Sequence, residues 1–99
     1  MNMNNLMAQA QRMQKDMERK QKEIYESEFV GSSELVEITI KGDKRIQSIK
    51  FKNMENFDIE DIDILEDMLK IAMNDAIDKV EKEIESKMGM YAKSLGGLM

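Results

Sequence analysis

The chain has 99 residues and a formal net charge of −5, and it contains neither cysteine nor histidine. Without cysteine there is no disulfide framework, thiolate zinc site or cysteine nucleophile, and without histidine the usual proton shuttle near neutral pH is missing. We therefore expect one domain that is not an enzyme and has no metal site, cofactor or small-molecule substrate. No apolar run approaches the roughly 20 residues of a membrane span, and the first residues are unlike a secretory signal, so a cytoplasmic location without membrane contact is expected.

The negative charge is concentrated in one part of the sequence. Residues 53–67 hold seven acids and no base, whereas residues 41–52 hold five bases and one acid. Because the distribution of charge matters more than its sum, basic surfaces can remain elsewhere. The net charge alone does not exclude a nucleic-acid partner.

Residues 5–26 have the apolar spacing of an amphipathic helix. No glycine or proline interrupts them, and the apolar positions are Leu6, Ala10, Met13, Met17 and Ile24. These intervals of three, four and seven residues predict a helix of about 20 residues that begins at Asn4 or Asn5, with Asn5 as its N-cap. So narrow an apolar stripe needs a partner surface.

The next segment changes to the spacing of strands. Turn residues at Gly31-Ser32-Ser33 and Gly42-Asp43-Lys44 separate short runs rich in β-branched residues. We expect an antiparallel meander with strands over residues 26–31, 34–41 and 45–52, covered by helices on one side. Residues 53–60 are expected to form a polar connector.

A second, longer helix is predicted from Asp61. Its broad apolar stripe continues to Met88, and acids gather at its start, where the helix dipole favours negative charge. The small residues Ala72 and Ala76 permit a close approach to a neighbour. Gly89 is expected to end the helix, which gives a single domain over residues 1–90 and a flexible tail over residues 91–99.

Two segments resemble the YbaB/EbfC family of bacterial nucleoid-associated proteins. They are residues 6–14, LMAQAQRMQ, and residues 65–76, LEDMLKIAMNDA. The resemblance covers nearly the whole chain apart from the tail. It implies an α+β fold with the order helix, three-stranded antiparallel sheet, long helix, a homodimer, and double-stranded DNA of the nucleoid as the partner. A dimer is also expected because two long helices and a small sheet expose more apolar surface than one chain can cover.

Basic residues on both helices are the candidate DNA contacts. Four fall on one side of the first helix, roughly opposite the apolar stripe, and two lie on the second: Arg12, Lys15, Arg19, Lys22, Lys79 and Lys82. Such a ridge on the first helix could follow phosphates, although an ordinary solvated face has the same pattern, since Asp16, Glu18 and Glu23 flank it. The bases of residues 41–52 could equally protect a sheet edge from aggregation. Asn74 is expected to hydrogen-bond strand backbone or a partner chain.

The predicted function is DNA binding by a homodimeric nucleoid-associated protein, mainly through phosphates and with low sequence specificity. The alternative is a helical adaptor whose methionine-rich surfaces bind another protein and which has little or no contact with DNA.

Overall fold

The computed structural model of the protein describes residues 2–94. Their elements follow the order α1 (Met3–Glu26), β1 (Glu28–Ser32), β2 (Val36–Lys41), β3 (Ile46–Phe51) and α2 (Ile62–Ser94). The three strands form one antiparallel sheet in the order β1-β2-β3. The predicted α+β class and element order are therefore confirmed, and the predicted strand bounds differ from these by at most two residues.

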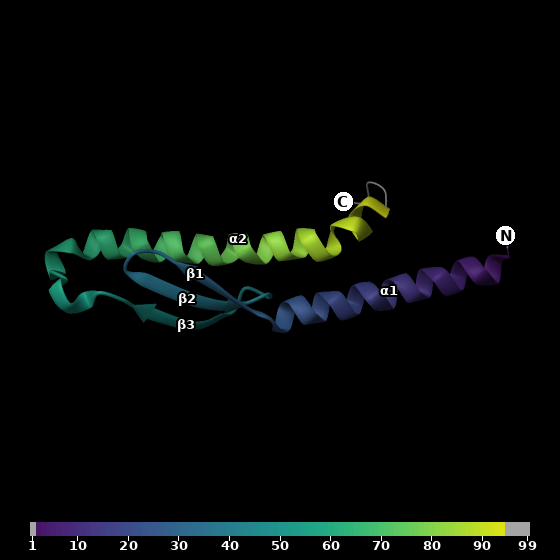
Figure 1. The fold of residues 1–99 in the computed structure, drawn as a ribbon, viewed down its shortest axis with the longest axis horizontal. Helices are drawn as coiled ribbons and strands as arrows, with labels where there is room; N and C mark the ends of the chain where they lie inside the picture. The colour runs from purple at the N-terminus through teal and green to yellow at the C-terminus, as the bar shows by residue number, and fades with distance from the viewer. Residues whose placement is uncertain (1, 95–99) are drawn as a thin grey trace.

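The molecule is long and thin. Its principal extents are 70 × 23 × 14 Å, and its radius of gyration of 19.6 Å far exceeds the about 12.6 Å of a compact domain of this length. As Figure 1 shows, α2 lies along one face of the sheet, while α1 leaves the sheet and projects well beyond it. The C-terminal half of α2 projects in the same direction. Neither α1 nor α2, over the residues described, has the length of uninterrupted apolar sequence that a membrane span requires.

The core lies between α2 and the two strands on which it packs, β1 and β2. Alternate residues of β2 are fully buried because side chains of a strand point to opposite faces in turn. They pack against one stripe of α2, and together the buried apolar residues of this cluster are Val36, Ile38, Ile40, Ala72, Ala76 and Val80. Short side chains at Ala72 and Ala76 let the helix approach the sheet closely. The small residues predicted to allow such an approach therefore do so.

The first helix begins earlier than predicted and ends at Glu26, as expected. The N-cap is Asn2, whose side chain accepts a hydrogen bond from the backbone N–H of Asn4 at 3.0 Å, so the assignment of Asn5 as the cap was wrong. Asparagine is an equally good cap at either position, and the earlier one adds a turn of helix. At the other end, Ile24 is 2% exposed and packs beside Gly42 of the β2–β3 turn.

The second helix begins and ends later than expected. The segment between β3 and α2, predicted as a polar connector, contains two short 3₁₀ turns, η1 (Met54–Asn56) and η2 (Ile59–Asp61). The side chain of Asp58 caps the second turn by accepting a hydrogen bond from the Glu60 N–H. At its other end the helix runs through Gly89 to Ser94, so the prediction that Gly89 ends it was wrong. A single glycine costs a long helix only about 1 kcal/mol. The first part of the predicted tail, residues 91–94, therefore belongs to the helix, and residues 95–99 lie outside the described part. The single domain over residues 1–90 stays a prediction.

Candidate nucleic-acid interface

Helix α1 carries a ridge of exposed basic side chains. Its members are Arg12, Lys15, Arg19 and Lys22, which are all exposed and which we call the α1 ridge. At 100° per residue they fall within a narrow arc on the side opposite Met13 and Met17, which are half-buried. The ridge extends over about 15 Å along the helix axis. It lies on the part of α1 that projects from the sheet in Figure 1.

Ion pairs compensate only part of the α1 ridge within the described residues. Asp16 pairs with Arg19 and, at 3.5 Å, with Lys20. Within residues 2–94, Arg12, Lys15 and Lys22 form no ion pair. Residues 2–15 contain no acid at all. The flanking acids therefore weaken the field most at the middle of the ridge and least at Arg12, which has no acid on its N-terminal side.

Lys79 and Lys82 belong to a different surface. With Glu28, Phe29, Val30, Glu83 and Ser86 they line a hollow of about 490 Å³ between α2 and the edge of β1. The Lys79 ammonium donates a hydrogen bond to the carbonyl oxygen of Val30 at 2.7 Å and lies 3.4 Å from the Asp75 carboxylate. A DNA contact by Lys79 would have to share or displace these partners. Its predicted role as a DNA contact stays a prediction, as does that of Lys82.

The basic residues around the β2–β3 turn are largely compensated. Lys44 lies 3.8 Å from Glu81 of α2, and Arg45 lies 3.7 Å from Asp43. Lys41 stands directly across the sheet from Glu28. Because each cation has an acid close by, this turn offers a weaker attraction for phosphate than the α1 ridge does.

The second helix holds β1 through a residue that the sequence reasoning passed over. Asp75, not Asn74, accepts a hydrogen bond from strand backbone, the Ser32 N–H at 3.0 Å, while Asn74 is exposed. The prediction that Asn74 bonds to the strand was therefore wrong by one residue, and its contact with a partner chain stays a prediction. The Ser32 hydrogen bond, followed by the Lys79 ammonium, holds the pKa of Asp75 below its usual value despite partial burial. In the sequence, the spacing i,i+4 of Asp75 and Lys79 was the feature from which this ion pair could have been predicted.

The chain is similar to known proteins over nearly its whole length. Residues 1–95 match the model of the YbaB/EbfC DNA-binding family. A nucleoid-associated protein of Streptococcus agalactiae is 46% identical over 94 residues, which are 93% of this chain and 94% of that protein. Nucleoid-associated proteins of Streptococcus pneumoniae (42% over 97 residues, 96% and 97% of the two chains) and Enterococcus faecalis (40% over 98 residues, 97% and 93%) are also similar.

The family match includes every described residue, and the relatives are matched over nearly their full length. The chain belongs to the YbaB/EbfC DNA-binding family.

Proposed function

We propose that the protein is a nucleoid-associated protein that binds double-stranded DNA through the phosphates, with the α1 ridge as its main contact surface. The observation that carries this proposal is the set of exposed cations on α1 that form no ion pair within residues 2–94, on a helix that projects away from the sheet (Figure 1). Exposed lysine and arginine that neutralise phosphates release condensed counterions, which favours binding to duplex DNA of any sequence. Family membership and the names of the relatives support DNA as the partner and the nucleoid as the location.

Low sequence specificity follows from the chemistry of the surface. Contacts to phosphate fix the position of a protein on the duplex but carry no sequence information, which comes from base edges in the grooves. The α1 ridge extends along the side of one helix over about 15 Å and is made of long, flexible side chains. We expect it to follow the backbone of either strand and to discriminate little between base pairs.

The active form in this proposal is a homodimer with two projecting α1 helices. The chain exposes 7594 Å², whereas a compact monomer of its mass exposes about 5,800 Å². Part of the excess is apolar: Ile46, Ile49 and Phe51 of β3 are 44–52% exposed. Each pairs with a buried residue of β2, so the three side chains lie on the same face of the sheet as α2. On this face α2 covers β1 and β2. A second copy that packs on this open strip would cover it and bring two α1 ridges to one duplex.

Duplex binding by a variant without the α1 ridge tests the proposal. Arg12, Lys15, Arg19 and Lys22 are replaced together by Gln, a good helix former, so that α1 stays helical. A matched control replaces four cations elsewhere, Lys44, Arg45, Lys50 and Lys70, which changes the net charge equally. By fluorescence anisotropy at about 50 mM salt, the ridge variant should lose at least about 100-fold in affinity and the control less than about tenfold.

The same assay separates the remaining outcomes. Two unrelated duplexes of equal length should bind within about threefold of one another, because phosphate contacts dominate. A greater loss in the control than in the ridge variant would move the site to the sheet and α2. Absence of binding by the parent at both about 50 and about 200 mM salt would favour the adaptor function instead.

A further inference from the structure

β1 is an edge strand of the sheet, and only one of its two sides pairs with β2. Ser33 N–H donates to the Val36 carbonyl at 2.8 Å, and Gly42 N–H donates to the Ser27 carbonyl at 3.1 Å. In an antiparallel pair, alternate residues bond to the neighbouring strand and those between them face away from it. The odd-numbered residues of β1 therefore bond to β2, and the backbone groups of Glu28, Val30 and Ser32 face away from the sheet.

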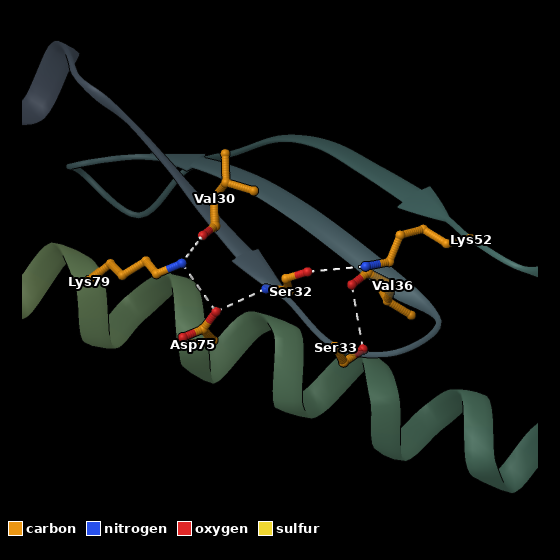
Figure 2. A network of polar contacts seen from close by, with 7 residues as sticks. All are labelled: Val30, Ser32, Ser33, Val36, Lys52, Asp75 and Lys79. Carbon is orange, nitrogen blue, oxygen red and sulfur yellow. Dashed lines mark hydrogen bonds and ion pairs between the residues drawn. The ribbon is translucent and has the colours of Figure 1, made fainter.

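Two of these outward groups are occupied by side chains of α2. The Lys79 ammonium donates to the carbonyl oxygen of Val30 at 2.7 Å, and the Asp75 carboxylate accepts from the Ser32 N–H at 3.0 Å. Figure 2 shows the two side chains rising from α2 to the strand edge, where they also pair with each other at 3.4 Å. The ammonium of Lys79 takes the place of a strand N–H, and the carboxylate of Asp75 takes the place of a strand carbonyl. Asp75 and Lys79 thus make contacts that the next strand of a sheet would make.

We infer that Asp75 and Lys79 form a side-chain seal on the β1 edge, which prevents a strand of a second copy from pairing there. An unprotected edge strand presents a row of N–H and C=O groups that templates such pairing. Without the seal, the β1 edge could pair with another strand through its free backbone groups. The apolar side chain of Val30 on that edge, which is 41% exposed, would add contact area to such a pair. The seal restricts association between copies to other surfaces, such as the open strip on β3. This inference concerns assembly and holds whether or not the α1 ridge binds DNA.

Removing the seal should create a new mode of self-association. Asp75→Ala frees the Ser32 N–H, and Lys79→Met frees the Val30 carbonyl while it keeps most of the apolar stem. Asp78→Ala is the matched control, since Asp78 is an exposed acid on the same helix. In sedimentation equilibrium over a concentration series, the double variant D75A/K79M should reach about twice the mass of the parent at its upper concentrations, as isologous pairing of β1 edges requires. The control and the conservative variant D75N, which retains an acceptor oxygen, should match the parent.

Amide hydrogen exchange distinguishes pairing from a loss of structure. The outward-facing Val30 N–H should gain protection in D75A/K79M as concentration rises, because a paired strand covers it, and should not do so in the parent. General unfolding would instead lower protection in β2 at every concentration. The inference is overturned if the double variant and each single variant keep the mass of the parent, or if protection of Val30 is independent of concentration.

Discussion

Gly31 of β1 is the position where the packing of α2 on the sheet can be tested most sharply. Its φ is not in the left-handed range, so alanine would be allowed by the backbone. A Cβ built there would nevertheless overlap the Ala72 carbonyl oxygen and the Ala76 backbone nitrogen of α2, and would lie 2.6 Å from the Ala76 Cβ. Backbone atoms cannot rotate out of the way as a long side chain can. The whole helix must therefore move.

The expected cost follows from that movement. Ordinary contact begins near 3.4 Å, so relieving the contact with the Ala76 Cβ alone would take a shift of about 0.8 Å, and the closer overlap with the Ala72 carbonyl oxygen requires a larger movement of α2 relative to β1. The shift would separate Ala72, Ala76 and Val80 from the fully buried residues of β2. Overpacking of a buried site typically costs 1–3 kcal/mol, and because the obstacle is backbone we expect Gly31→Ala to cost about 3 kcal/mol. For a domain of this size that lowers the melting temperature by roughly 12–24 °C.

Thermal unfolding followed by circular dichroism measures this, with Gly89→Ala as the control. At Gly89 an added Cβ would lie 4.0 Å from the Glu85 Cγ, an ordinary van der Waals contact and the one that the described residues offer there. Since Gly89 lies inside α2, alanine should stabilise the helix by about 0.8–1 kcal/mol and raise the melting temperature by a few degrees. The two Gly→Ala changes should therefore have opposite signs. A Gly31→Ala protein that melts within about 2 °C of the parent would refute the close approach of α2 to β1.

Three further predictions concern the core, the seal and the dimer. Ile38→Ala empties a fully buried site and should cost about 2–5 kcal/mol, seen as a lower urea midpoint at unchanged m-value. Asp75 has a lowered pKa in the folded chain, so its contribution to stability is complete above about pH 4 and is lost as pH falls through that lowered value. The urea midpoint of the parent should therefore fall more between pH 5 and about pH 3 than that of Asp75→Asn; equal falls would contradict this. Ile49→Lys places a charge in the open strip on β3 and should shift sedimentation from about twice 11.5 kDa toward the monomer.

Hydrophobic spacing was sufficient to predict the order of elements. The 3.6-residue period of α2 and the two-residue period of β2 are local properties, and each appears in the structure as burial on one side. The period of α1 predicted its helix, although Ile24 is the one buried residue of α1 and Leu6 and Ala10 of its stripe are exposed. Helix ends were harder to predict. Asn2, Asn4 and Asn5 are similarly good N-caps for α1, and the length of α2 offsets the cost of one glycine at Gly89, so that the helix continues past it.

Contacts between distant elements could not be derived from spacing alone. Asp75 and Asn74 differ by 100° around α2, so the choice between them depends on how the helix is rotated against the sheet. That rotation is set by the packing of Ala72 and Ala76 on β1 and β2. The bond from Lys79 to Val30 joins residues 49 apart in the chain. For the α1 ridge, the sequence predicted the exposed face. That Arg12, Lys15 and Lys22 form no ion pair with any described residue could be seen only in the structure.

The salt dependence of duplex binding tests the central proposal most directly. Each phosphate neutralised contributes about −0.9 to the slope of log K against log salt concentration, so two ridges of four cations predict a slope of up to about −7 for the parent dimer. Lys15→Gln should make the slope shallower by about 1.8, one contact from each protomer, with no change in the preference between duplexes. A slope that stays at the parent's value when the whole α1 ridge is replaced by Gln would contradict the proposal.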